Sequence, residues 1–213
     1  RIYKYPFQEQ LLIYAQRPDA TACASIEVWN SRKLNCWVNK GAKGIALIDE
    51  ENSYTRLKYV FDVSDVHKAR RIGRDPYLWE LKQEQEQSVM KRLEHIYGET
   101  DAEKSFGDRL LEIAESVTND CYEEVAEDLL YLTDGSFLDG LDEYSLKVHL
   151  RETLRASISY TLLTRCGLDA EDYQDSMNFD FIHEFNSMDT LAVLGDAANE
   201  LAKPVLLEIG RTI

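Results

Sequence analysis

The stretch that decides the fold of the first part of this chain is Asn35-Cys-Trp-Val-Asn-Lys-Gly-Ala-Lys-Gly-Ile-Ala-Leu-Ile-Asp49. It sets a short polar loop between two apolar runs. Trp37 and Val38 end the first run, and residues 45–48 form the second. Apolar runs on either side of a glycine-containing turn predict two strands joined in a hairpin.

The loop of this hairpin combines positive charge with backbone freedom in Lys40, Gly41, Lys43 and Gly44. Glycine allows positive φ and a close approach to a ligand, and the lysines set charge beside backbone amides, which suits a phosphate. A hairpin turn without a ligand explains the same residues, and both interpretations remain open. The Gly-x-x-Gly spacing also occurs in KH domains, where it joins two helices. No Gly-Lys-Ser/Thr follows, as it would in a P-loop.

The segments around the hairpin predict helices before it and a third strand after it. Residues 7–16 have the spacing of a short helix that stops before Pro18. Ser25 is a candidate N-cap for a second short helix ending near Leu34. Residues 56–63 predict a strand with one buried and one wet face, because apolar side chains alternate with polar ones at Leu57, Tyr59, Phe61 and Val63.

From about residue 76 the apolar spacing becomes helical. Pro76 suits a first helical turn, and Gly98 ends that run. Thr100-Asp-Ala-Glu103 predicts the start of a second helix and Asp120 the start of a third. We expect a loop at residues 133–141, and further helices at 146–162, 179–185 and 188–202, the last interrupted at Pro204.

The fold class is therefore α+β: a small helix-plus-antiparallel-sheet part at residues 1–70, with the hairpin and the third strand, and an all-helical part at 71–213. Charge divides in the same way. Residues 1–75 hold 13 Lys and Arg against 9 Asp and Glu, a net +4, whereas residues 76–213 hold 11 against 30, a net −19, and the two add to −15. Any nucleic-acid contact should be confined to the first third.

Cations and aromatic residues gather around the hairpin in the sequence. We take Arg32, Lys33, Arg56 and Lys58 as additional DNA-contact candidates from their charge alone, and further cations follow at Lys68, Arg70, Arg71 and Arg74. The interleaved aromatic residues are Trp29, Trp37, Tyr54 and Tyr59. A cationic groove with aromatic platforms is typical of proteins that hold single strands. Burial in the core is the competing interpretation for each tryptophan.

We find no pattern that predicts an enzyme, a metal site or a cofactor. His183-Glu184 begins an HExxH zinc signature, but Ser187 occupies the position of the second histidine. The acidic helices, which include Glu123, Glu124, Glu127 and Asp128, are compatible with metal carboxylates or a glycosidase pair, but a solvated helix face explains them at least as well. Four widely spaced cysteines indicate reduced thiols in a cytoplasmic protein. The apolar runs are far shorter than the roughly 20 residues of a membrane-spanning helix, so we expect no membrane contact.

The first part of the chain resembles the N-terminal domain of ArdC-type antirestriction proteins over roughly residues 5–66. The matching segments are Gln10-Leu-Leu-Ile-Tyr-Ala-Gln16, Ala24-Ser25 with Trp29, Val38-Asn-Lys-Gly-Ala-Lys-Gly-Ile-Ala46 and Val60-Phe-Asp-Val-Ser64. The resemblance implies binding of single-stranded DNA and protection of incoming DNA from restriction. It also implies that Lys40, Gly41, Lys43 and Gly44 contact the DNA, with Trp37 beside them.

The helical part, at Cys166-Gly-Leu-Asp169 and through Phe185-Asn186, resembles the region that follows this domain in very large proteins of conjugative elements. Those proteins often continue into helicase or DNA-methylase parts. Full-length ArdC-type proteins also carry a zinc-peptidase-like domain with HExxH, which is not matched here. The resemblance therefore implies no peptidase, helicase or methylase activity for these residues.

Two hypotheses of function follow. The first is a non-catalytic, sequence-tolerant single-stranded DNA-binding module of a mobile-element protein, with a conjugative or antirestriction role. The alternative is that the acidic helical part mimics DNA or docks a protein partner, such as a restriction enzyme or another DNA-binding enzyme. A structural spacer whose acidity only keeps it in solution is the plainest interpretation of that part.

Overall fold

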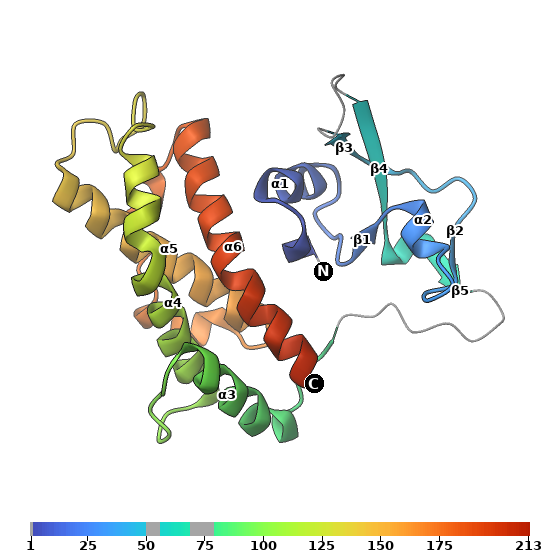
Figure 1. Ribbon diagram of the computed structural model, residues 1–213. Coiled ribbons are helices and arrows are strands. Elements are labelled where there is room, and N and C mark those ends of the chain that lie inside the picture. The colour runs from blue at the N-terminus through green and yellow to red at the C-terminus, as the bar shows by residue number, and fades with distance from the viewer. Residues whose placement is uncertain (1, 50–55, 69–78) are drawn as a thin grey trace. The chain divides into compact units, whose positions relative to one another are not determined.

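The computed structural model of the chain describes residues 2–49, 56–68 and 79–213, which divide into two units, Arg1–Leu78 and Trp79–Ile213 (Figure 1). The first unit combines helices with short antiparallel strands and the second is helical, so the predicted α+β class is confirmed. The boundary expected between residues 70 and 71 lies outside the described residues.

Within its described residues, the first unit contains two small sheets. One is three-stranded in the order β1-β4-β3 and the other pairs β2 with β5, and both are antiparallel. Its elements are η1 (Ile2–Lys4), α1 (Phe7–Gln16), β1 (Cys23–Ala24), α2 (Ile26–Trp29), β2 (Cys36–Val38), β3 (Ile45–Asp49), β4 (Arg56–Asp62), η2 (Val63–Asp65) and β5 (Val66–Lys68).

The predicted pairing of the two strands in residues 35–49 is wrong. β2 pairs with β5, where Trp37 lies opposite His67, and β3 pairs with β4, where Ile48 lies opposite Leu57. β4 has seven residues and gives β3 a full-length partner, which the three residues of β2 could not. The lysine-glycine loop is therefore a connection between two sheets.

The predicted faces of β4 are reversed. Leu57 and Tyr59 are exposed, at 58% and 53% of their surface, whereas Val60 and Asp62 are buried. The buried face is set by α1, which packs on β3. Its core consists of Ile13, Cys23, Ile45, Leu47 and Val60. Asp62 is tolerated at the buried end of the strand because its carboxylate accepts hydrogen bonds from backbone amides.

Helix α1 has the predicted bounds and also protects the sheet. Gln16, its last residue, donates from Nε2 to the carbonyl oxygen of Ala46 at 2.8 Å and accepts the Ala46 amide on Oε1 at 3.0 Å. Its side chain therefore occupies one position on the open edge of β3. Ser25 caps α2 as predicted, accepting the Val28 amide on Oγ, but that helix ends at Trp29 and does not reach Leu34.

The second unit is built from four long helices and two 3-10 turns: α3 (Gln83–Tyr97), α4 (Phe106–Leu129), α5 (Glu143–Arg165), η3 (Ala170–Ser176), η4 (Ile182–Glu184) and α6 (Met188–Thr212). Gly98 and Gly167 have positive φ just past the ends of α3 and α5, as their predicted role as helix ends requires. The predicted loop at residues 133–141 lies between α4 and α5.

Three predicted helix boundaries are wrong. α4 begins after Ser105, which accepts the Asp108 amide at 3.1 Å, while Thr100 donates its hydroxyl to Glu94 at 2.6 Å. Asp120 lies inside α4 and starts no new helix. Pro204 lies inside α6. Its ring is exposed while Ala202, Val205, Leu206 and Ile209 stay buried. Packing of that face outweighs the cost of an interior proline, about 3 kcal/mol.

Only part of two other predicted helices is found. The stretch expected at residues 179–185 is reduced to the turn η4. The helix that Pro76 was expected to open begins, within the described residues, at Gln83; Pro76 itself lies outside them.

Candidate nucleic-acid interface

The two-stranded ribbon of β2 and β5 presents an aromatic pair. Trp37 and His67 are directly opposite in the register and therefore share one face of the ribbon. Trp37 is 49% exposed, and His67 is also exposed, with Nδ1 2.7 Å from Asn39 Oδ1. Cys36, on the other face, is fully buried. The structure therefore excludes Trp37 from the core.

Trp29 has the opposite environment. It is 3% exposed, and its indole Nε1 donates to the Phe61 carbonyl oxygen at 2.9 Å. This tryptophan packs beneath β4 and cannot stack on a ligand. Of the two tryptophans that the sequence left open, one belongs to the core and one to the surface.

The loop after β2 holds its lysines in solvent. Lys40, Gly41 and Lys43 are exposed, and the Asn39 amide donates to the Asp65 carbonyl at 2.8 Å, which ties the loop to η2. Gly41 has φ +88°, and a Cβ there would meet nothing within 4 Å, so glycine serves the turn. The positive φ expected of both loop glycines is found only at Gly41.

Gly44 packs closely against β4. A Cβ built on it would lie 3.1 Å from Tyr59 Cβ and 3.2 Å from Phe61 Cζ. The backbone of the loop therefore rests against two aromatic side chains of β4. Tyr59 is exposed, although the alternation in residues 56–63 predicted it on the buried face. The sequence placed it among the aromatic residues around the loop but not among the predicted contact residues.

The remaining candidate cations divide into two groups. Arg32 and Lys33 are exposed in the turn that precedes β2, close in sequence to the ribbon. Arg56 and Lys58 lie near the start of β4, away from the end that leads into η2 and β5. Lys58 forms an ion pair with Glu9 of α1 at 2.6 Å, which neutralises its charge and places it on the α1 face.

The structure therefore brings Trp37 and the loop lysines together and leaves Arg56 and Lys58 apart from them. Tyr54, Arg70, Arg71 and Arg74 lie outside the described residues.

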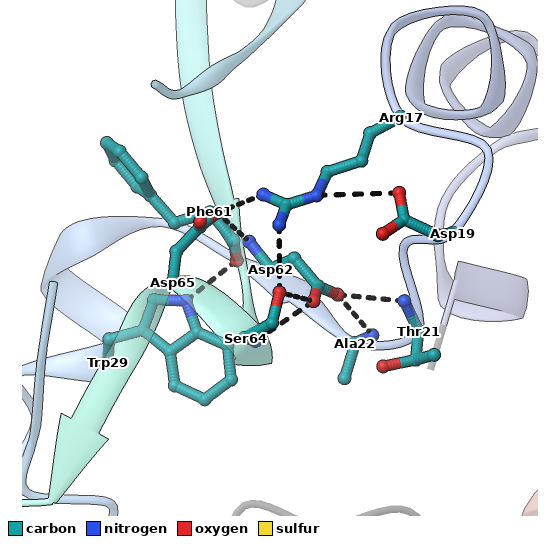
Figure 2. Close-up of polar contacts among 9 residues, drawn as sticks. All are labelled: Arg17, Asp19, Thr21, Ala22, Trp29, Phe61, Asp62, Ser64 and Asp65. Carbon is teal, nitrogen blue, oxygen red and sulfur yellow. Dashed lines mark hydrogen bonds and ion pairs between the residues drawn. The ribbon is translucent and has the colours of Figure 1, made fainter. Parts of the chain in front are cut away.

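A buried carboxylate holds the corner between the two sheets (Figure 2). Asp62, 2% exposed, accepts the amides of Thr21 and Ala22 on Oδ1 at 2.8 and 2.9 Å. Its Oδ2 accepts the amide and hydroxyl of Ser64 at 3.0 and 2.7 Å. Burial opposes ionisation, but the hydrogen bonds from Ser64, Ala22 and Thr21 outweigh it and lower the pKa of Asp62 below its usual value.

Arg17 extends this cluster to the end of α1. Its guanidinium pairs with Asp65 through Nη1 and with Ser64 Oγ through Nη2, the latter at 2.9 Å. Asp65 in turn accepts the Asp62 amide at 3.2 Å and so closes a capping box around η2. We call Arg17, Asp62, Ser64 and Asp65 the corner cluster. Its Asp62 and Ser64 belong to the Val60-Phe-Asp-Val-Ser64 segment that carries the resemblance, and their contacts here are structural.

Nothing in the described part of the chain forms a metal centre, since no three His, Cys, Asp or Glu residues lie together suitably. Glu184 Oε2 instead lies within hydrogen-bond distance of His149 Nδ1, at 2.6 Å, and His149 stacks on Phe181 at 3.8 Å between ring centroids. The four cysteines are thiols. Burial raises the pKa of Cys23 to about 11 and that of Cys166 to about 12.

Among the helices that the structure describes, none has both the length and the apolar character needed to cross a bilayer.

A scan against protein-family models finds no match to this chain, and searches of curated proteins and of solved structures find none either. What the fold and the surface define is an α+β unit in which an exposed aromatic pair precedes a loop with two exposed lysines, and a helical unit with a net negative charge.

Proposed function

We propose that this chain is a non-catalytic, sequence-tolerant single-stranded DNA-binding module of a mobile-element protein, with a conjugative or antirestriction role. The observation that carries the proposal is the exposure of Trp37 on the β2–β5 ribbon, directly before a loop that holds Lys40 and Lys43 in solvent. The sequence resemblance to ArdC-type domains supports it over the same residues.

The proposed binding joins two physical terms. Lysines that neutralise phosphates release counterions, so the affinity falls as the salt concentration rises. Each phosphate contact with a single strand contributes about −0.7 to the slope of log affinity against log salt concentration. A base stacked on an exposed aromatic ring adds about 1 to 3 kcal/mol whatever its identity. Neither term reads the sequence of the DNA.

The test is a salt titration of the whole chain with single-stranded DNA, duplex DNA and RNA. We expect Lys40→Glu/Lys43→Glu to weaken binding of single strands and to lower the salt slope by about 1.4, the sum of two phosphate contacts. The matched control is Lys82→Glu/Lys91→Glu, which makes the same change in charge in the second unit, where both lysines are exposed. Equal binding by wild type and the loop variant would remove the loop from the site.

The division of charge between the units favours one rival. The second unit carries all of the net −19 of residues 76–213, because residues 76–78 are uncharged. A DNA mimic or protein-docking surface in that unit predicts that the chain inhibits a restriction enzyme, and that Lys40→Glu/Lys43→Glu inhibits it equally well. Binding of single strands that is absent at low salt, or indifferent to salt, would overturn the DNA-binding proposal and favour this rival.

A further inference from the structure

The sheet of the first unit has one covered face and one open face. Helix α1 covers the face that carries Ile45, Leu47 and Val60. The opposite face carries Tyr59 across from Ala46 and Leu57 across from Ile48. Tyr59, Leu57 and Ile48 are exposed at 53, 58 and 42% of their surface. We call these four residues the open sheet face.

The open sheet face is continuous with the lysine-glycine loop. Gly44 lies against Tyr59, since a Cβ added to this glycine would lie only 3.1 Å from Tyr59 Cβ and 3.2 Å from Cδ1. Lys43, the residue before it, is exposed. The loop therefore has an exposed aromatic ring near each end: Trp37 before Lys40, and Tyr59 beside Gly44.

We propose that Tyr59 is a second stacking platform, so that a single strand crosses the loop with one base on Trp37 and another on Tyr59. This inference rests on the proposed function and extends its site onto the open sheet face. The four residues of the open sheet face are uncharged, so their side chains do not repel a polyanion. The cation at their rim, Lys43, is placed to meet a phosphate between the two bases.

The chemistry of this surface selects single strands over duplexes. The bases of a duplex are already stacked on one another and offer no free face to a ring, whereas each base of a single strand does. Aliphatic side chains such as Leu57 and Ile48 can pack against a sugar or base face without reading its edges. The predicted ligand is therefore a flexible single strand of any sequence.

The experiment separates stacking from charge with two ligands of equal length: oligothymidylate, and an oligonucleotide of abasic residues with the same phosphates. The variants, made in the whole chain, are Tyr59→Thr, Tyr59→Phe and Tyr14→Ala. Threonine removes the ring but keeps a high strand propensity. Tyr14 is the matched control, because it is an exposed tyrosine of the same unit on α1.

We expect Tyr59→Thr to weaken binding of oligothymidylate by about 5- to 150-fold, the range for loss of one stacked base. Tyr59→Phe keeps the ring and should bind as wild type does, as should Tyr14→Ala. All three should bind the abasic strand as tightly as wild type.

Three outcomes would overturn this inference alone. If Tyr59→Thr binds oligothymidylate normally while Lys40→Glu/Lys43→Glu does not, the strand does not reach Tyr59 and the proposed function stands without it. If Tyr59→Thr weakens both ligands equally, Tyr59 acts through the fold. If it abolishes self-association in sedimentation without changing affinity, the open sheet face belongs to a protein contact. Failure of wild type to bind either ligand would remove the proposed function and this inference together.

Discussion

One carboxylate, that of Asp62, joins three segments of the first unit: the stretch before β1, the end of β4 and the turn η2. We expect Asp62→Asn to destabilise the first unit by about 1 to 3 kcal/mol, because an amide nitrogen would face donors that now share a carboxylate. Hydrogen exchange of the Thr21 and Ala22 amides should accelerate with the loss. The control is Asp19→Asn, whose side chain is 83% exposed and should change little.

The same residue predicts a pH dependence. The pKa of Asp62 is lowered on folding, so its contribution to stability is present above the ordinary value of 3.8 and is lost as the pH falls through the lower, folded value. The difference in unfolding free energy between wild type and Asp62→Asn should therefore shrink as the pH drops below 3.8. A difference that grows on acidification would contradict this assignment.

A second residue-scale prediction concerns Gly107 in α4. A Cβ there would lie 2.0 Å from the hydroxyl of Tyr173, so Gly107→Ala must displace that ring from the helix. The lost packing should cost about 1 to 3 kcal/mol, more than the gain of up to about 1 kcal/mol in helix propensity. In a Tyr173→Ala background the sign should reverse, and Gly107→Ala should stabilise. Urea denaturation of the four chains measures both effects.

These two positions show where sequence reasoning stops at the scale of single residues. Nothing in the sequence around Gly107 indicates the ring that arrives from Tyr173, and a helix-weakening glycine there has no local explanation. The alternation of residues in β4 predicts Asp62 on the wet face of the strand. Its burial depends on amides at Thr21 and Ala22, about forty residues earlier in the chain.

At the scale of elements, the open edge of β3 is guarded by one side chain. The amide of Gln16 makes both hydrogen bonds with Ala46 that a neighbouring strand would make. We expect Gln16→Ala to speed hydrogen exchange at the Ala46 amide and to raise strand-mediated self-association at high protein concentration. The exposed Gln8 of the same helix supplies the control, Gln8→Ala; equal behaviour of the two variants would show that Gln16 does not guard the edge.

Elements were predictable where their signals are local. Glycines past helix ends, the Ser25 cap and the bounds of α1 all follow from nearby residues. Strand pairing does not follow from nearby residues. We expected β2 to pair with β3, its neighbour in sequence, but β4 forms a longer pairing with β3. Asp120 and Glu123 predicted a new helix start, but both lie inside α4. Residues of α4 are buried before them, at Val117 and Thr118, and after them, at Ala126 and Leu129, so one helix continues through this position.

At the scale of the whole molecule, the reactivity of the cysteines can measure the unfolding of each unit, because Cys23 lies in the first unit and Cys166 in the second. Cys23 and Cys166 are buried thiols whose raised pKa suppresses the reactive thiolate at neutral pH. We expect Cys121, which is only partly buried, to be alkylated first in the native chain. As urea rises, Cys23 should react before Cys166, because the first unit has the smaller hydrophobic core. Labelling of both at one urea concentration would show that the units unfold together.

The division of charge along the chain can be read from the sequence alone, because it requires only a count of charged residues. Charge and periodicity change together between residues 66 and 76, and the two units divide at Leu78. The exposure of individual side chains was less predictable. Trp37 is exposed because β2 pairs with β5, and Trp29 is buried where its indole donates to Phe61 of β4. Charge alone grouped Lys58 with the loop, whereas its ion pair with Glu9 places it on the covered face.

The run from β4 through η2 to β5 has one further consequence. A strand repeats every two residues, so the three residues of η2 set the phase between the sheet that carries Tyr59 and the ribbon that carries Trp37. Insertion of one residue after Ser64 would keep both sets of apolar residues but turn His67 away from Trp37 or shift the ribbon by one position. The spacing of this turn, and not only the residues on either side of it, is thus part of what defines the surface.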